Sequence, residues 1–441
     1  MKTYSFWRDT IAGDALVGAS SVVPDVHASS PKSAQTKADV AIVGAGLTGL
    51  SAARELAKRG VRVVVIDAEQ AGWGASSRNG GMLLTGLKLG PHELVSKFGL
   101  ERARALDAAS LAAIDHVERV IKEEAIDSEF RRCGHLALAS KPAHQAQFAR
   151  DAELINSRFG RAVRLIPPQE LHSEIDSSAY FGALLDEASA GANPAKLVNG
   201  LARAAAGAGA AIVERAPVRH IERHKHASSR FTLQTDHSTI EAEQIIVATG
   251  AYTSAESAWL QRRIVPIGSY VIATEPLSEP VAAKLAPQAR MMFDSKHFLH
   301  YFRLTSDRRM LFGGRASFVP ESDRATAESA AVLRRDMVMI FPQLKDARVD
   351  YAWGGTIDFT ADMLPHAGEI DGIYFAAGYA GHGVALATLL GAQIGARIGG
   401  ANVDSPFMDS SFPLPALGAH RVFPGLVSAA GAWYRFLDLV S

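Results

Sequence analysis

A strand–helix–strand pattern stands out in the first part of the chain. The apolar run 38–43 leads into Gly44-Ala45-Gly46-Leu47-Thr48-Gly49, and residues 47–59 then carry apolar positions at helical spacing. A second apolar run, 61–66, ends at Asp67. Short continuous apolar runs bounded by turns are typical of buried strands, so residues 38–67 are predicted to form a βαβ unit.

The rest of the pattern alternates between helices and strands and then becomes mainly strands. Helical spacing predicts helices over 91–125, 142–159, 194–208, about 325–340, and from about 384 to 399. Short apolar or alternating runs predict strands over 134–139, 211–213, 218–222, 231–235, 244–250, 264–275, 291–294, 299–304, 309–313 and 372–377. The strands between 264 and 313 are expected to form a mostly antiparallel sheet.

The glycines of the first turn match a dinucleotide-binding fingerprint. The first glycine permits the tight turn, the second lets the backbone approach a pyrophosphate, and the third lets the helix pack closely on the strand. The helix N-terminus then faces the phosphate charge, and Asp67 ends the second strand, where a carboxylate binds ribose hydroxyls. The alternative without a ligand is a glycine cluster that only caps a helix.

The place of this fingerprint favours FAD over NAD. It lies close to the N-terminus, and a nicotinamide site would need a second copy, which the chain lacks. The strand 245–250 follows much later, as in a sheet that is completed after a long insertion. A second strand–glycine–helix junction, Gly378–Val384, offers a helix N-terminus that would stabilise the negative charge of a reduced flavin.

Composition narrows the function classes only modestly. The 441 residues suggest two or three domains, and 46 Lys and Arg balance 46 Asp and Glu, so no basic surplus points to nucleic acid. Cys133 is the single cysteine, which excludes an intramolecular disulfide, and no metal site is expected. No membrane-spanning helix and no signal peptide are expected, so the cytoplasm is the expected location. The helically patterned run 426–440 is expected to pack on its own domain.

Several motifs resemble the D-amino acid oxidase-like FAD-dependent oxidoreductases, the family that includes glycine oxidase and sarcosine oxidase. The similarity is greatest to the gamma-glutamylputrescine oxidase branch, and it spans nearly the whole chain. It is carried by residues 72–81 (GWGASSRNGG), 272–277 (IATEPL), 311–314 (LFGG) and 378–384 (GYAGHGV), with 4–7 (YSFW) and 433–435 (WYR) in support.

The resemblance implies an α/β fold. A Rossmann-like FAD-binding domain of the glutathione reductase type would be interleaved with an α+β substrate domain built on a mostly antiparallel sheet. The expected parts are an N-terminal arm (1–37), three FAD-binding segments (38–86, 191–250 and 351–400), a helical and substrate-domain segment (87–190), a substrate-domain segment (251–350), and a C-terminal tail and helix (401–441).

The predicted FAD contacts come from the fingerprint, the resemblance and the late junction. The fingerprint contributes Gly44, Ala45, Gly46, Leu47, Thr48, Gly49, Asp67 and Ala68. The resemblance implies Gly74, Ala75, Ser76, Ser77, Asn79, Gly80, Gly81 and Met82 along the pyrophosphate and flavin, Val218 at the adenine, and Thr249 and Gly250 near the ribose and phosphates. The junction contributes Gly378, Tyr379, Gly381, His382, Gly383 and Val384. No cysteine follows Cys133, so the late cysteinyl link of sarcosine oxidase is impossible, and non-covalent FAD is expected.

Five side chains are candidates for substrate contact or catalysis. His382 is predicted to lie beside the flavin, where it either tunes charge and accepts a proton or only packs against the ring. Tyr270 is expected on a strand that covers the flavin. Tyr301 and Arg303 alternate onto one face of a strand, as an aromatic wall and an anion clamp or as a half-exposed sheet face. Trp353 is either another wall or part of the core.

The resemblance implies an oxidoreductase that removes a hydride equivalent from a carbon bearing nitrogen. Imine hydrolysis and reoxidation by dioxygen, giving peroxide, would complete the reaction. The alternatives are a dehydrogenase that passes electrons to a quinone or carrier protein, and a non-enzymatic flavoprotein. A gamma-glutamylated polyamine, a cyclic imino acid, a simple amino acid and an aminophosphonate all remain open as substrates, and the oligomeric state is not indicated.

Overall fold

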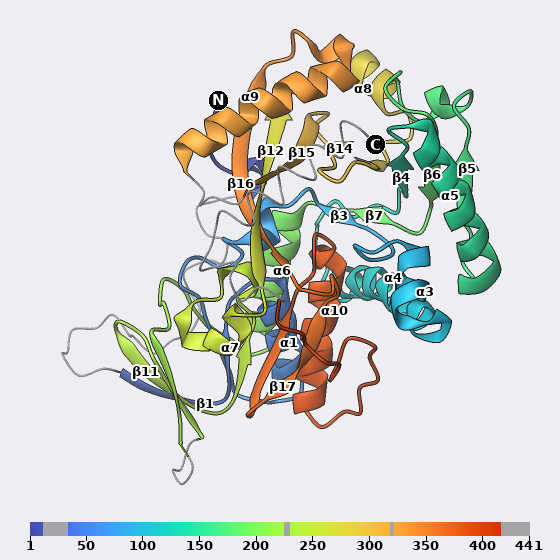
Figure 1. The fold of residues 1–441 in the computed structure, drawn as a ribbon. Coiled ribbons are helices and arrows are strands. Elements are labelled where there is room, and N and C mark those ends of the chain that lie inside the picture. Colours follow the sequence, from blue (N-terminus) through green and yellow to red (C-terminus); the bar gives the residue numbers. More distant parts are fainter. Residues whose placement is uncertain (12–33, 225–229, 318–321, 416–441) are drawn as a thin grey trace.

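The chain folds around two large β-sheets that face each other across a central region (Figure 1). The computed structural model describes residues 1–11, 34–224, 230–317 and 322–415. Each large sheet has eight strands, and a third sheet pairs the short strands β3 (Met82–Leu83) and β7 (Ala190–Gly191). The two sheets are interleaved along the chain, because the second sheet takes strands from 135–186 as well as from 265–359, and the first sheet is completed by strands within 366–377.

The first sheet is the predicted Rossmann-like unit. β1 (Ala34–Val43) pairs in parallel with β2 (Val63–Ile66) and with β11 (Ser238–Val247), although more than a hundred residues separate β2 from β11. The path β17-β18-β11-β1-β2-β8 is extended by a hairpin on β11. The remaining strands are β8 (Ala211–Val213), β9 (His220–Arg223), β10 (Phe231–Gln234), β17 (His366–Ile370) and β18 (Ile373–Ala377). The fold class predicted from the sequence is confirmed for this unit.

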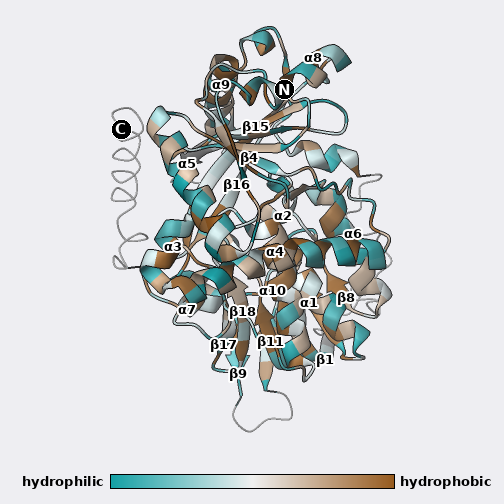
Figure 2. Ribbon diagram, turned by 90° about the vertical axis from the view of Figure 1, so that its right-hand side faces the viewer, coloured by the Kyte–Doolittle hydropathy of each residue, from teal (hydrophilic) through white to brown (hydrophobic). Residues whose placement is uncertain are grey.

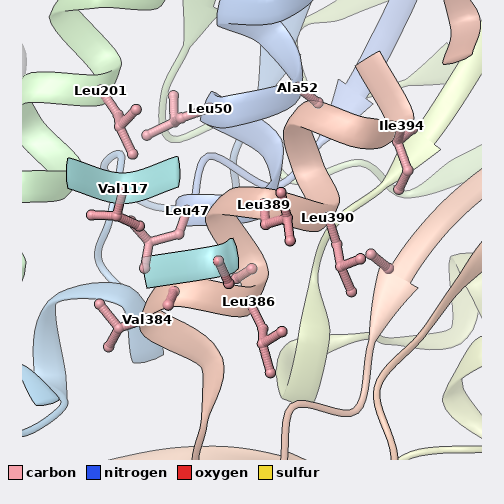
Figure 3. Close-up of a cluster of buried hydrophobic side chains, with 14 of the residues drawn as sticks. Leu47, Leu50, Ala52, Val117, Leu201, Val384, Leu386, Leu389, Leu390 and Ile394 are labelled. Atoms are coloured by element: carbon pink, nitrogen blue, oxygen red, sulfur yellow. The ribbon is translucent and has the colours of Figure 1, made fainter. Parts of the chain in front are cut away.

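Helices with small and apolar faces form the core beside this sheet. Leucine and valine side chains of α1, α10, α4 and α6 meet in one cluster (Figure 3), and α10 is mostly coloured as hydrophobic in Figure 2. An added Cβ on Gly391 of α10 would lie 2.1 Å from the Thr48 carbonyl oxygen, so only glycine permits this close contact with α1. The helices are α1 (Leu47–Lys58), α3 (Pro91–Phe98), α4 (Leu100–Glu123), α6 (Pro194–Gly207) and α10 (Gly383–Ile398).

The second sheet is mostly antiparallel, as predicted, with one parallel pair between β13 and β4. The helix α9 (Asp323–Ile340) lies across β12, β15 and β16 (Figure 1). The strands follow the order β16-β12-β15-β14-β13-β4-β6-β5. Their bounds are β4 (His135–Leu138), β5 (Arg164–Ile166), β6 (Ala183–Asp186), β12 (Val265–Thr274), β13 (Met291–Asp294), β14 (Tyr301–Leu304), β15 (Met310–Ser317) and β16 (Val349–Phe359).

Shorter elements connect these units, and some differ from the predicted bounds. The predicted helix 91–125 is two helices because Gly99, at φ +79°, breaks it, and the helix 142–159 ends in a π-turn over Ile155–Phe159. The remaining short helices are α2 (Ala75–Arg78), α5 (Pro142–Leu154), α7 (Ala258–Gln261), α8 (Glu279–Leu285) and the 3-10 turns Phe6–Thr10, Leu171–Ser173, Gly250–Tyr252, Ala255–Ser257 and Pro342–Leu344. Residues 351–359 belong to β16 and pair with β12, so the predicted FAD-domain boundary at 351 falls inside the second sheet.

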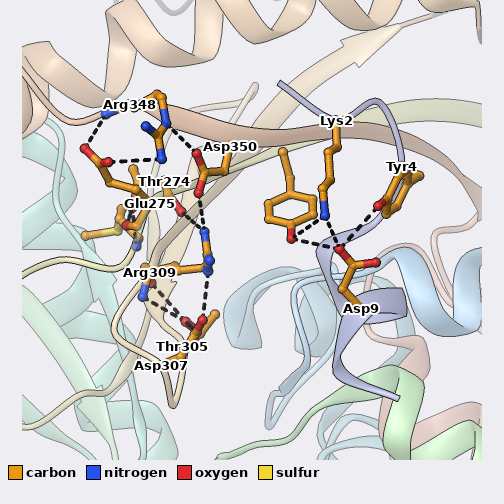
Figure 4. Close-up of polar contacts among 12 residues, drawn as sticks. Lys2, Tyr4, Asp9, Thr274, Glu275, Thr305, Asp307, Arg309, Arg348 and Asp350 are labelled. Carbon is orange, nitrogen blue, oxygen red and sulfur yellow. Dashed lines mark hydrogen bonds and ion pairs between the residues drawn. The ribbon is translucent and has the colours of Figure 1, made fainter. Parts of the chain in front are cut away.

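The first residues of the chain are docked, which corrects the prediction of an arm over 1–37. Phe6 and Trp7 are buried, at 5% and 1% exposure, and pack against the second sheet. The Asp9 carboxylate accepts hydrogen bonds from Lys2, Tyr4 and Tyr351 (Figure 4). Residues 34–37 are part of β1, while residues 12–33 and the patterned segment 426–440 lie outside the described residues.

Membrane-spanning helices and clusters of metal ligands are both absent from the described residues. Among them, no helix is both long enough and apolar enough to cross a bilayer. The same ranges hold no cluster of three or more His, Cys, Asp or Glu side chains arranged around a metal ion. Cys133 is a free, buried thiol in an apolar cluster with Met82 and Met291, so it packs as a small apolar side chain.

Candidate active site

A cavity of about 760 Å³ lies between the two large sheets. Its wall on the Rossmann-like side comes from the first glycine turn, the loop 72–82, residues 248–252 and the junction 379–384. Its opposite wall comes from residues 267–269, 297–301 and 355–359 of the second unit. This volume is typical of small-molecule and cofactor sites, and the cavity joins the two units that the sequence predicted separately.

The glycine turn at the end of β1 forms a cradle that larger residues would fill. Gly44 has φ +108°, and an added Cβ there would lie 2.7 Å from the Ala248 carbonyl oxygen. A Cβ on Gly46 would lie 2.9 Å from Ser76 Oγ, at the cavity wall. α1 begins directly after Gly46, which has no side chain to cap it. The Leu47 N–H donates to Ser76 Oγ at 3.0 Å, and this helix start borders the cavity, where it favours an anion.

Asp67 closes the far side of this cradle. Its carboxylate accepts hydrogen bonds from the backbone N–H groups of Ala45, at 2.6 Å, and Glu69, at 2.8 Å. Burial raises the pKa of the Asp67 carboxyl above its usual value. The side chain borders the cavity at the end of β2, where the sequence predicted a ribose contact.

The loop 72–82 is held in shape by its own side chains. The Asn79 amide donates to the carbonyl oxygens of Ala75 and Ser76, and its oxygen accepts from the Gly81 N–H at 2.8 Å. The Ser77 hydroxyl donates to the Gly72 carbonyl at 2.6 Å. This loop therefore presents backbone to the cavity in a fixed conformation.

The late junction is fixed by a buried carboxylate that the sequence reasoning missed. Asp358 at the end of β16 accepts hydrogen bonds from the N–H groups of Gly378, at 2.6 Å, and Tyr379, at 3.3 Å. Burial raises the pKa of Asp358 to about 6. Tyr379 in turn forms a 2.7 Å hydrogen bond with the Thr48 hydroxyl, which ties the two helix starts together. An acidic residue between Ile357 and Phe359 was the available signal.

His382 sits at the N-terminus of α10 and borders the cavity. Burial, and secondarily the nearby charge of Lys88, lower its pKa to about 4. Its Nδ1 atom is buried and has no hydrogen-bond partner among the described residues. The imidazole is therefore neutral at physiological pH and offers an unused polar atom at this wall.

Tyr301 borders the cavity, whereas Arg303 does not. The Tyr301 ring packs directly against two glycines: an added Cβ would lie 3.1 Å from the ring at Gly80 and 2.1 Å from it at Gly313. The Tyr301 hydroxyl borders the cavity region near Ser269, whose Oγ lies 3.3 Å away. Arg303 is 5% exposed and donates to the carbonyl oxygens of Gly81 and Ala192, both at 3.1 Å. Arg303 thus supports the loop backbone, and the predicted anion clamp is wrong for this residue.

Tyr270 and Trp353 also point away from the cavity. Tyr270 is 3% exposed in the core on the other face of the second sheet, while its neighbour Ser269 borders the cavity. Trp353 packs with Phe6 and Trp7, and its indole N–H donates to the Arg78 carbonyl at 2.8 Å. Side chains alternate between the two faces of a strand, so the one-residue difference puts Tyr270 and Ser269 on opposite faces of β12. Trp353 packs with Val271, on the same face as Ser269, and does not border the cavity because it is buried in the cluster with Phe6 and Trp7.

Most of the predicted FAD residues border the cavity. The exceptions are Ala45, Gly49, Ser77, Gly81 and Gly378, which form the backbone behind it. The bordering residues are Gly44, Gly46, Leu47, Thr48, Asp67, Ala68, Gly74, Ala75, Ser76, Asn79, Gly80, Met82, Val218, Thr249, Gly250, Tyr379, Gly381, His382, Gly383 and Val384. Cavity residues that the sequence reasoning missed include Lys88, Phe293, His297, Phe298 and Asp358; most lie in loops without periodicity.

Comparison with known proteins identifies the family. The family model described as FAD dependent oxidoreductase matches residues 39–397. The chain belongs to this family. This FAD-dependent oxidoreductase is 33% identical over 389 residues to the gamma-glutamylputrescine oxidoreductase of Escherichia coli, with 88% of each chain covered. It is 32% identical over 408 residues to a probable oxidoreductase, OrdL, of Haemophilus influenzae, covering 91% of this chain and 92% of that one.

Solved structures of other enzymes share the fold of this chain. Glycine oxidase from Geobacillus kaustophilus superposes with a TM-score of 0.70 at 25% identity, covering 85% of this chain and 99% of that one. L-proline dehydrogenase from P. horikoshii gives a TM-score of 0.68 at 21% identity, with 85% and 98% covered. The glycine cradle, the start of α1 at the cavity wall and the Asp67 carboxylate fit the pyrophosphate and ribose of the FAD that this family uses.

Asp358 is expected to make the stability of the FAD-free protein depend on pH. The pKa of Asp358 in the folded chain, about 6, lies above the usual value of 3.8, so the folded state holds the proton more tightly. The resulting stability is fully present below about pH 4 and is lost as the pH rises through about 6, by on the order of 3 kcal/mol. Asp358→Asn should remove this loss.

Urea unfolding of the wild type and of Asp358→Asn between pH 4 and 8 measures this effect as the difference between the two curves. The wild type should lose stability relative to the variant over that interval. A difference that stays constant with pH would contradict the assignment of the raised pKa to Asp358.

Proposed function

We propose that this oxidoreductase oxidises the carbon–nitrogen bond of an amine or an amino acid. The supporting observation is that the cavity with the glycine cradle in its wall is also lined by His382, by Tyr301 and by the apolar side chains of Phe293, Phe298 and Leu299. The names of the relatives, gamma-glutamylputrescine oxidoreductase and glycine oxidase, point to the same substrate classes.

The cofactor would be held without a covalent bond. The single cysteine, Cys133, is buried among methionines, and His382 borders the cavity as a neutral base. FAD, when bound, would supply the acceptor for the hydride equivalent, and we propose dioxygen as the oxidant that restores it, with peroxide as the product.

The protein's own residues would position the substrate and exclude water from it. Aromatic and aliphatic side chains of residues 293–299 line the cavity and would favour the neutral, free-base form of an amine. His382, with a pKa near 4 and an unpartnered Nδ1, can accept a hydrogen bond or a proton from the substrate nitrogen. The Tyr301 ring forms a wall beside Gly80 and would orient the reacting carbon.

Anaerobic reduction of the bound flavin tests this proposal. The purified holoenzyme is mixed with amines, amino acids and gamma-glutamyl amines, and the flavin absorbance near 450 nm is followed (about 450 nm is the general flavin band). Bleaching by one class is expected and would name the substrate. Admission of air should then restore the band and release peroxide. A fully FAD-loaded protein that no nitrogen compound bleaches would contradict the proposal.

The same experiment separates an oxidase from a dehydrogenase. If air restores the band slowly while a quinone or dye restores it quickly, then the oxygen step of the proposal is wrong and the C–N oxidation stands. Rapid recovery in air would support the oxidase.

A further inference from the structure

His300 follows the cavity-lining residues 297–299 directly in the chain, and each of its ring nitrogens faces a carboxylate. Its Nδ1 atom is 2.9 Å from Asp294 Oδ2, at the end of β13, and its Nε2 atom is 3.3 Å from Asp336 Oδ2, on α9. Residues 297–299 border the cavity, whereas His300 does not. These two contacts, called the His300 bridge below, connect the chain beside the cavity wall to α9.

The geometry of the His300 bridge favours the doubly protonated ring. An ionised carboxylate can only accept hydrogen bonds, so a nitrogen that faces one has to carry a proton. Burial opposes the positive charge of His300, but the hydrogen bonds to Asp294 and Asp336 outweigh it and raise the pKa of His300 above its usual value of 6.5. The imidazolium therefore persists to a higher pH than it does in an exposed histidine.

The other charges around the imidazole come from the same two segments. The Lys296 ammonium lies 3.8 Å from Asp294 Oδ2, and Arg335 pairs with Asp336 Oδ1 at 2.9 Å. From β15, the Phe312 ring packs on the imidazole with 5.2 Å between the ring centres. Loss of the proton would turn a nitrogen lone pair toward a carboxylate oxygen, so at least one of the two contacts in the bridge would become repulsive.

Asp294 also fixes the backbone of the segment that follows it. Its Oδ1 atom accepts the N–H groups of His300, at 3.0 Å, and Lys296, at 3.4 Å. The Asp294 N–H group in turn donates to the His300 carbonyl at 2.9 Å. Residues 295–300 are therefore closed onto Asp294 at both ends, and the contact of His300 with Asp336 joins this closed segment to α9.

We propose that His300 is a positioning residue, which as an imidazolium holds residues 297–299 in the cavity wall and releases them from α9 when it loses its proton. The folded chain binds this proton more tightly than the unfolded chain does. The stabilisation is therefore complete below pH 6.5 and is lost as the pH rises through the higher pKa of His300 in the folded protein. The effect on the wall is independent of the reaction, whereas any effect on catalysis rests on the proposed function.

Hydrogen–deuterium exchange of the holoenzyme between about pH 6 and 10 tests the His300 bridge. Mass spectrometry gives protection factors for residues 295–300, corrected for the intrinsic pH dependence of exchange. Protection of the wild type should fall about 10-fold as the pH rises, the effect of losing one charge-assisted hydrogen bond. His300→Gln cannot gain a charge and should show low protection at every pH. Asp336→Asn removes one anionic partner and should move the fall in protection to lower pH.

His92→Gln is the matched control, because His92 forms an ion pair with Asp151 at the surface, at 2.9 Å. It should show the exchange profile of the wild type. FAD content and thermal unfolding of each variant show whether the fold is intact, and the profile of Asp336→Asn decides if His300→Gln does not fold. Protection in the wild type that does not change with pH, or an Asp336→Asn profile identical to that of the wild type, would overturn the proposal.

The two proposals fail in different ways. If amines bleach the flavin but protection of residues 295–300 does not depend on pH, the His300 bridge is wrong and the C–N oxidation stands. If the protection titrates but no amine bleaches the flavin, the bridge stands and the proposed reaction is wrong. With both in place, His300→Gln should raise KM over the wild type at low pH, and the ratio should approach one as the wild type also loses the bridge.

Discussion

Gly49→Ala is expected to yield protein that neither binds FAD nor folds stably. An added Cβ at this position would lie 1.9 Å from the Gly44 carbonyl oxygen and 3.2 Å from the Ile42 side chain. The first contact is with backbone, so α1 would have to move away from β1 or the glycine turn would have to change shape. Overpacking of a core typically costs about 1–3 kcal/mol, and a backbone overlap of this size should exceed that range.

The measurement is the flavin absorbance of the purified variant together with its thermal unfolding. Gly60→Ala is the matched control, since Gly60 ends the same βαβ helix and an added Cβ there would meet no atom within 4 Å. Its φ of +79° predicts a loss of only about 1 kcal/mol, with FAD retained. If Gly49→Ala retained FAD and stability as well as Gly60→Ala does, the close contact of α1 with the glycine turn would not be required for folding or for FAD binding.

Trp7→Ala is expected to destabilise the protein by about 3–5 kcal/mol and to weaken FAD binding. Trp7 is 1% exposed, and its indole N–H donates to the Asn79 carbonyl at 2.8 Å. The Arg303 guanidinium lies 5.2 Å from the centre of its ring. Removal of the indole would leave a cavity beneath the loop 79–82 and would take away the ring that covers the Arg303 guanidinium. Both the free energy of unfolding and the affinity for FAD should therefore decrease.

Urea unfolding and the release of flavin fluorescence measure these two effects. Trp7→Phe should keep most of the packing and lose about 1 kcal/mol for the missing hydrogen bond. Tyr4→Ala, in the same segment but 38% exposed, should cost less than about 1 kcal/mol and leave FAD binding unchanged. Equal losses in Trp7→Ala and Tyr4→Ala would show that the docked segment does not support the loop.

The candidate active site was predictable wherever its residues lie together in the sequence. The turn Gly44–Gly49, the loop 72–82 and the junction Gly378–Val384 each carry a local signal, and almost all of their residues line or back the cavity. The place of β11 in the same sheet as β1 could also be predicted, because a buried parallel strand has a continuous apolar pattern of its own.

Other parts of the site depended on contacts between distant segments. Alternation correctly put Tyr301 and Arg303 on one face of β14, but Gly81 and Ala192 cover only the Arg303 end. Asp358 meets Gly378 because the end of β16, while still paired with β12, lies beside the late junction that follows β18. Lys88 lies in a loop without periodicity, so its place on the cavity could not be read from spacing.

The sequence by itself therefore determined the family, the cofactor and the two-sheet architecture of this protein, since glycine turns and apolar periodicity are local consequences of backbone sterics and burial. The tertiary structure decided that Arg303 does not border the cavity. The alternation along β14 places Arg303 on the same face as Tyr301, but packing gave Arg303 the carbonyl oxygens of Gly81 and Ala192 as partners. Such hydrogen bonds depend on which distant segments meet, and no local pattern contains that information.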